Sequence, residues 1–140
     1  GTEFLHRLEE GGPFPLITSC SPGWIKFGET FYPELLENVS SCKSPQQMLG
    51  ALIKTHFADS RGLDPARIVS LSIMPCTAKK FEARRPEMSD SGYRDVDVVL
   101  TTRELARMIR QAGINFEELQ DTHPYDLMSG YTGAATIFGS

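Results

Sequence analysis

Residues Ile68–Met74, with the sequence IVSLSIM, decide the fold, because they alternate apolar with polar side chains and include β-branched residues. That pattern predicts a short β-strand. A second apolar run, Val96–Leu100, predicts another strand, and it leads into Thr101-Thr102-Arg103-Glu104, a capping box that opens a helix. Helices alternating with short apolar strands indicate an α/β fold whose mainly parallel, short β-sheet is flanked by helices.

The residues before this strand pair predict further elements. We expect a helix over Thr2–Glu10, a buried strand over Phe14–Thr18, and a helical segment over Trp24–Leu36 that Pro33 bends or splits. Ser44-Pro45 has the residue types of a helix start, a capping side chain followed by proline. The apolar face of the helix that follows comprises Met48, Leu49, Leu52, Ile53, His56 and Phe57. On that face, His56 is expected to be a core histidine.

Two segments complete the expected organisation. Residues Thr77–Arg94 are charged and contain Pro86 and Gly92, so we expect them to be irregular. The capping box should open a helix that turns Leu105, Met108 and Ile109 inward and stops at Gly113. No internal repeat or linker divides the chain, so residues 1–140 are treated as a single domain. Both ends are abrupt, as in a fragment of a longer protein or at a cloning boundary.

Composition restricts the function classes. Hydrophobic residues make up 40% and charged residues 23%, as in soluble globular proteins. The net charge of −4 argues against a nucleic-acid partner, and no apolar run reaches the roughly 20 residues that cross a bilayer. The first ten residues lack the pattern of a signal peptide. Three cysteines, an odd and sparse set, favour reduced thiols in the cytoplasm over a disulfide framework.

Two of the cysteines follow expected strands. Cys20 comes after Phe14–Ser19, and Cys76 comes after Ile68–Met74. Parallel strands place the loops at their carboxyl ends in one crevice, where a metal or redox site can form. Lys79 and Lys80 would stabilise negative charge there. The plainer interpretation is that each cysteine is a small buried apolar residue, which is the preferred interpretation of Cys42. Two thiols do not complete an iron–sulfur site.

Carboxylates and histidines add little on their own. Glu3 and Glu82 are candidate proton carriers, although either is also explained as a surface or salt-bridged residue. The histidines show no metal-ligand spacing.

At this point the motifs are recognisable. Thr18-Ser19-Cys20-Ser21-Pro22-Gly23-Trp24 resembles the first signature of the [FeFe]-hydrogenases, and Met74-Pro75-Cys76-Thr77-Ala78-Lys79-Lys80-Phe81-Glu82 resembles the second. Other segments are similar to the family in the same order: Tyr32–Leu36, Ser40–Gln46, Arg94–Asp97, Thr101–Ala106, Tyr131–Ala134 and Phe138–Gly139. The likeness covers essentially the whole chain, and several long motifs in the family's order make it specific.

The resemblance implies one lobe of the H-cluster domain of the large subunit, from an enzyme that reversibly oxidises H2 to protons and electrons. In such a parent the cofactor is the H-cluster, a 4Fe-4S cubane joined to a two-iron subcluster. Four cysteines hold the cubane, and two of them belong to a third signature that this sequence does not contain. The isolated chain is therefore expected to bind no cluster and to be inactive alone.

The resemblance also assigns roles by position. Cys76 corresponds to a metal ligand, and Cys20 to the thiol that passes protons. Glu82, Ser40 and Glu3 correspond to members of the proton path, and Arg7 to a residue near its outer end. The residues corresponding to the cofactor pocket are Lys79, which donates a hydrogen bond to a cyanide, together with Met74, Pro75, Gln46 and Ser21.

Ser21 is where the chain departs from the family pattern. The family has a second cysteine there, which is a cubane ligand, and a serine is a poor substitute for a thiolate on iron. Ser21 is either a natural variant, with Cys20 taking the ligand role, or an engineered change. The implied partners are ferredoxin- or NAD(P)-linked electron-transfer subunits. The alternative is a non-catalytic relative, either a redox or H2 sensor or an iron–sulfur assembly factor. A third possibility is an α/β domain without a metal.

Overall fold

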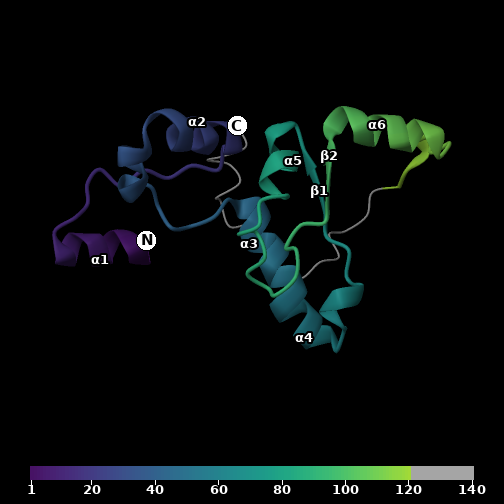
Figure 1. Cartoon of the computed structure of the whole chain (residues 1–140). Coiled ribbons are helices and arrows are strands. Elements are labelled where there is room, and N and C mark those ends of the chain that lie inside the picture. Colours follow the sequence, from purple (N-terminus) through teal and green to yellow (C-terminus); the bar gives the residue numbers. More distant parts are fainter. Residues whose placement is uncertain (121–140) are drawn as a thin grey trace.

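The computed structural model describes residues 1–120 as a set of short helices around one pair of strands (Figure 1). Residues 121–140, which include the Tyr131–Ala134 and Phe138–Gly139 motifs, lie outside the described part. The strands are β1 (Leu71–Met74) and β2 (Val98–Thr101). The α-helices are α1 (Thr2–Glu10), α2 (Pro22–Phe31), α3 (Pro45–Leu52), α4 (Ala58–Arg61), α5 (Ala78–Glu82) and α6 (Thr102–Gln111). A π-helical turn, η2 (Ile53–Phe57), joins α3 to α4, and 3-10 helices cover η1 (Pro33–Asn38), η3 (Pro65–Arg67) and η4 (Phe116–Glu118).

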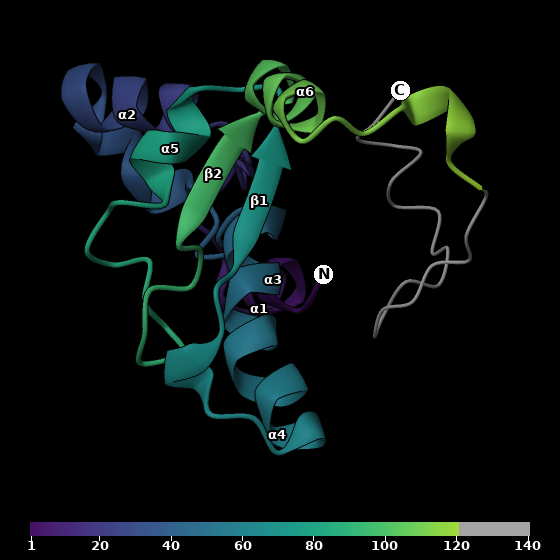
Figure 2. The same cartoon turned by 90° about the vertical axis from the view of Figure 1, so that its right-hand side faces the viewer.

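The two strands form the expected parallel pair. Leu71 lies opposite Val98 and Met74 opposite Thr101, and both strands run toward α6 (Figure 2). This confirms an α/β fold with a short parallel sheet flanked by helices. Both strands begin later than expected, at Leu71 and Val98. Just before them, the Asp97 carboxylate accepts the Ser70 N–H at 2.8 Å, and the Ser70 carbonyl accepts the Asp97 N–H at 2.9 Å.

The expected strand over Phe14–Thr18 is wrong. The segment makes one isolated parallel bridge, between Ile17 and Val39. Pro13 and Pro15 have no N–H to donate to a ladder, which explains why an apolar run of this length forms no strand here. Cys20 therefore does not follow a strand.

The helix boundaries that depend on neighbouring residues are confirmed. Thr2–Glu10 forms α1, and α2 ends at Phe31, before Pro33 begins η1. Ser44 accepts the Gln47 N–H at the start of α3. The capping box at Thr101 and Glu104 opens α6, and Gly113 adopts a left-handed conformation, with φ of 68°, just beyond it.

Two expectations about helices are wrong. The segment Thr77–Arg94 is not irregular throughout, because α5 occupies Ala78–Glu82 ahead of Pro86. In α6, Leu105 and Ile109 are half-buried, but Met108 is 52% exposed and does not turn inward.

The expected inner face of α3 is also wrong, and His56 is exposed. The side that packs inward carries Gln46, Gln47 and Gly50 of α3, followed by Lys54 of η2 and Ala58 of α4. Met48, Leu49 and Leu52 of α3 are exposed. Polar contacts explain this orientation. The Lys54 ammonium binds the Asp97 carboxylate at 2.7 Å and donates to the Arg94 carbonyl at 2.5 Å. A buried ammonium needs such partners, and they fix which side of the helix turns inward.

The apolar core beneath the sheet is small. Ala83, Val96 and Val99 are buried together, with Met74 packed against them. Leu71, Ile73 and Val98, on the opposite face of the strands, are exposed. Side chains alternate between the faces of a strand, so the sheet has one covered and one open face.

An ion-pair cluster joins α2 to the segment after α5. The Arg85 guanidinium binds both carboxylate oxygens of Glu29 and also contacts Glu87. The hydrogen bonds from Arg85 hold the pKa of Glu29 below its usual range. α2 and α5 are in contact, and this cluster lies at one end of that contact.

Gly50 allows α3 to lie directly against the segment that leads into β2. A Cβ at this position would lie 2.5 Å from the Asp95 carbonyl oxygen and 2.8 Å from the Val96 side chain. We therefore expect Gly50→Ala to lower the free energy of unfolding by about 1–3 kcal/mol, measured by urea denaturation. Gly28→Ala in α2 is the matched control, because nothing lies within 4 Å of its Cβ and alanine is the better helix former. Equal stability of the two variants would contradict the close approach.

Glu29 should make stability depend on pH. Its pKa is lowered from 4.5 in the folded protein, so its contribution is complete above the unfolded pKa and is lost as the pH falls through the folded pKa. The gap in free energy of unfolding between wild type and Glu29→Gln should be largest above about pH 5 and shrink in more acid solution. Urea titrations across this range measure it. A gap that does not change with pH would show that the Arg85 pair contributes nothing.

Candidate functional site

Lys79 brings the two cysteine motifs together. Its ammonium donates to the Cys20 carbonyl oxygen at 2.6 Å, across 59 residues of sequence. Lys79 lies in α5, three residues after Cys76, and Cys20 lies in the turn before α2. Both cysteines are exposed. The proximity expected from two strand ends is therefore achieved by a strand end and a helix start, linked by this lysine.

The Lys79 ammonium belongs to a buried polar network. It contacts Glu82 Oε2 at 2.9 Å, and the same oxygen accepts from Gln46 Nε2 at 3.2 Å. The side-chain amide oxygen of Gln46 in turn accepts a hydrogen bond from the Ser72 hydroxyl at 2.8 Å. Lys79, Glu82 and Gln46 are 7%, 6% and 6% exposed. The network thus connects α3, β1, α5 and the Cys20 turn.

This network leaves Lys79 with capacity for a further acceptor. An ammonium has three N–H donors, and the described residues supply two acceptors, the Cys20 carbonyl and the Glu82 carboxylate. A cation so deeply buried stabilises negative charge beside it. Lys79 can therefore bind an anionic group that lies near Cys20 and Cys76.

Glu3, Ser40 and Arg7 form a second cluster. The Ser40 hydroxyl donates to Glu3 Oε2 at 2.5 Å, and Arg7 Nη2 binds Glu3 Oε1 at 2.8 Å. The Ser41 N–H also donates to Glu3 Oε1, at 3.1 Å. These hydrogen bonds, that from Ser40 foremost, hold the pKa of Glu3 below its usual range. Arg7 anchors the cluster by donating to backbone carbonyls of residues 13 and 37–39.

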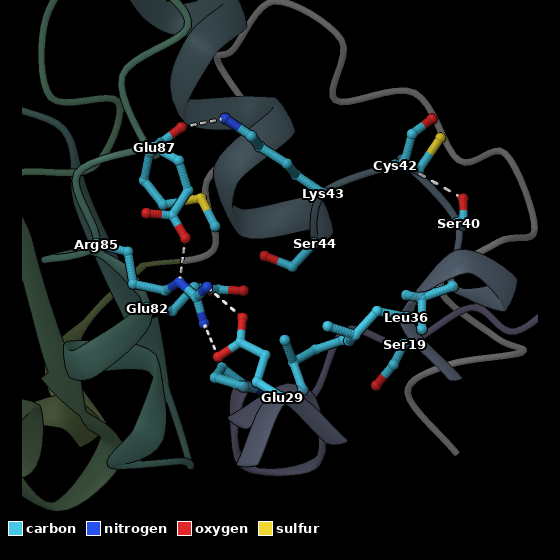
Figure 3. Close-up of a pocket in the computed structure, with 15 residues that line it drawn as sticks. Ser19, Glu29, Leu36, Ser40, Cys42, Lys43, Ser44, Glu82, Arg85 and Glu87 are labelled. Carbon is cyan, nitrogen blue, oxygen red and sulfur yellow. Dashed lines mark hydrogen bonds and ion pairs between the residues drawn. The ribbon is translucent and has the colours of Figure 1, made fainter. Parts of the chain in front are cut away.

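A cavity of about 380 Å³ separates the two networks (Figure 3). Glu82 lies on one of its walls and Ser40 on another, so both face the same space. The Arg85–Glu29 pair and Cys42 also line it. Cys42 donates its backbone N–H to the Ser40 hydroxyl at 3.1 Å, and its thiol is exposed rather than buried in a core.

Met74 and Pro75 lie beside the network. Met74, together with Gln46 and Ser72, lines a second cavity of about 320 Å³ between α3 and β1. Pro75 is exposed, as is Ser21, whose main role in the structure is to precede α2. Of the expected site residues, Cys20, Lys79, Glu82 and Gln46 form one connected group, and Glu3, Ser40 and Arg7 form another.

Sequence reasoning missed Arg85, Glu29 and Ser72. Each acts through a partner far along the chain, and no local spacing identifies such a pair. Pro86, directly after Arg85, indicates a loop, and nothing in that pattern predicts the ion pair between Arg85 and Glu29.

The described residues do not provide a complete iron–sulfur site. No cluster of three or more His, Cys, Asp or Glu side chains in residues 1–120 is placed to hold a metal ion. A cubane needs four ligands, and the two signature segments offer the exposed thiols of Cys20 and Cys76. These residues therefore fit one wall of a cluster site and not the whole of it. Within the same residues, no helix is long and apolar enough to cross a membrane.

The curated proteins that the chain resembles include iron hydrogenases and, at lower identity, an iron–sulfur cluster assembly factor. The chain is 52% identical over 139 residues to iron hydrogenase 1 of Clostridium pasteurianum, covering 99% of this chain and 24% of the relative. It is 54% identical over 141 residues to the periplasmic [Fe] hydrogenase large subunit of Nitratidesulfovibrio vulgaris, covering 99% and 34%. A cytosolic Fe-S cluster assembly factor of Xenopus tropicalis is 39% identical over 135 residues, with 91% and 28% covered.

A solved structure agrees. An apo [FeFe]-hydrogenase variant from Chlamydomonas reinhardtii superposes with a TM-score of 0.83 at 44% identity, covering 96% of this chain and 34% of that one. The chain thus spans about a quarter to a third of the hydrogenases it matches. The family model described as iron only hydrogenase large subunit, C-terminal domain, matches residues 1–140. The chain belongs to this family of iron-only hydrogenase large subunits.

Proposed function

We propose that this chain is part of an [FeFe]-hydrogenase that interconverts H2 with protons and electrons at an H-cluster, and that it is inactive alone. The observation that carries the proposal is the Lys79 contact with the Cys20 carbonyl. It joins the two signature segments around one buried cation, where a negatively charged cluster would be stabilised. Family membership supports the reaction, and the partial ligand set supports inactivity.

The proposed cluster ligand within the described residues is Cys76. The H-cluster, when bound in a complete enzyme, supplies the redox chemistry. Ser21 stands where the family has a thiolate, so the chain would bring a single expected ligand unless Cys20 takes that role. Met74, Pro75 and Gln46 would line the pocket, and Lys79 would donate its remaining N–H to an anionic ligand.

The chain's own residues would move protons. The proposed order begins at the Cys20 thiol and passes through Glu82, Ser40 and Glu3 to Arg7. The cavity shared by Glu82 and Ser40 is large enough for several waters, which would bridge them. Ser40 already donates to Glu3, so it would pass its proton to that carboxylate and be reprotonated from the cavity.

Electron partners are proposed from the resemblance, and the compartment is proposed from the cysteine content. Ferredoxin- or NAD(P)-linked subunits are the partners proposed from the resemblance. The sparse, odd set of three cysteines supports the cytoplasm. One of the relatives is named as periplasmic, which makes that compartment the alternative to test by fractionation.

A non-catalytic role is the second candidate, either a sensor of H2 or redox state or an iron–sulfur assembly factor. Ser21 in a ligand position favours it, and so does the 39% identity to an assembly factor. The Glu3–Ser40–Arg7 cluster favours catalysis, because a protein without turnover has less use for a proton path. H2 evolution by a full-length version would separate the two.

Reconstitution tests the partial ligand set. After anaerobic treatment with iron and sulfide, the chain should retain well under four irons and lack stable 4Fe–4S absorbance, because a cubane needs four ligands. Ser21→Cys should raise the retained iron by adding a thiolate, and Cys76→Ala should lower it. Iron analysis and visible spectra measure both. Stable, stoichiometric cluster absorbance in the unaltered chain would overturn the proposal that its site is incomplete.

The proton path can be tested at Glu3. Ser40→Ala removes the hydrogen bond that most lowers the pKa of the Glu3 carboxyl, so that pKa should rise toward its usual range. Titration of the Glu3 carboxyl by carbon-detected NMR measures the change. Ser41→Ala is the control, because Ser41 contacts Glu3 through its backbone N–H and keeps that bond. Equal shifts in both variants would argue against the Ser40 contact.

A further inference from the structure

Ser72 has a polar partner that no motif indicates. It lies in the middle of β1, and its hydroxyl donates to the side-chain amide oxygen of Gln46 at 2.8 Å. Gln46 is buried in α3, and its other amide end donates to Glu82. Ser72 is therefore the first member of a chain of hydrogen bonds that ends at the Cys20 turn.

The chemistry of the amide makes this arrangement directional. A carboxylate only accepts hydrogen bonds, so Glu82 requires the NH2 end of Gln46 to face it. That leaves the Gln46 oxygen at the opposite end, where the Ser72 hydroxyl supplies the matching donor. With both ends satisfied, the amide has no reason to rotate. Without the hydroxyl, a buried acceptor is left unpaired.

The next link depends on the amide being fixed. Glu82 Oε2 accepts from Gln46 Nε2 and from the Lys79 ammonium at once. A carboxylate held on one side by the amide presents that oxygen to Lys79 in a constant direction. Lys79 then reaches the Cys20 carbonyl at 2.6 Å. Hydrogen bonds in a buried chain also strengthen one another.

We propose that Ser72 is a positioning residue for the Lys79 ammonium, acting through Gln46 and Glu82. This deepens the proposed function, because Lys79 is the cation that links the second cysteine motif to the first. The reactivity of the Lys79 amine can be measured in the 140-residue chain itself. The outcome of that measurement is therefore independent of whether the parent protein turns over H2.

Amine acetylation followed by mass spectrometry measures how often Lys79 leaves its site. Loss of one buried hydrogen bond should raise its acetylation rate about tenfold in Ser72→Ala. Ser72→Thr keeps the hydroxyl and should restore a rate near that of the wild type. Lys54 is the internal control, because it is 4% exposed in a separate pair with Asp97. Its acetylation rate should not change in either variant.

Equal increases at Lys79 and Lys54 would mean that Ser72 contributes only to overall stability, and would overturn the proposal. If Ser72→Ala unfolds, the acetylation rates of Lys79 and Lys54 would also rise together, and the proposal would be overturned in the same way. A double-mutant cycle tests the route. In a Gln46→Met background, Ser72→Ala should cause no further increase at Lys79, because the connecting amide is gone. A full tenfold increase in that background would show that Gln46 does not transmit the effect.

Discussion

An ammonium that is taken out of water must be met by acceptors, and at Lys79 this requirement organises the site. Removing such a charge from water costs several kcal/mol unless partners replace the lost hydration. Glu82, one helical turn away, supplies the opposite charge, and the Cys20 carbonyl supplies a second acceptor. Two segments of chain, α5 and the Cys20 turn, are thereby held at one point. They cannot separate without leaving the buried cation exposed or short of an acceptor.

Lys54 imposes the same kind of constraint on the fold. Its pairing with Asp97 holds η2, which continues α3, against the segment before β2, and Gly50 of α3 permits the close contact beside it. The apolar core is correspondingly modest, with Ala83, Val96 and Val99 at its centre. Hydrophobic burial alone would not choose the orientation of α3, because its more apolar side is the exposed one. Paired charges make that choice.

Features set by neighbouring residues could be predicted from the sequence. The capping box at Thr101 and the break at Pro33 rest on interactions over a few residues. The alternation of helices with short apolar strands predicts the parallel pair. The inward face of α3 and the exposure of His56 could not be predicted, since they follow from Lys54 meeting Asp97, 43 positions further along. The apolar run Phe14–Thr18 predicts a strand, yet Pro13 and Pro15 prevent a ladder.

The site divides in the same way. Cys20, Cys76, Lys79 and Glu82 are identified by motif, and in the structure Lys79 of the second signature segment donates to the Cys20 carbonyl of the first. Their catalytic roles stay predictions. The Arg85–Glu29 pair spans 56 residues and Ser72–Gln46 spans 26, so each is visible only after folding. Polar pairs between residues so far apart in the sequence leave no periodic signal.

The outward face of α3 affects how this protein would behave in a cell. Met48, Leu49 and Leu52 lie open to water, as do Leu71, Ile73 and Val98 on the strands. Chaperones and quality-control proteases recognise exposed apolar side chains of this kind, and free copies would associate through them. The lifetime of the polypeptide would then be set by how quickly that surface is covered after synthesis, and not by the strength of its own small core.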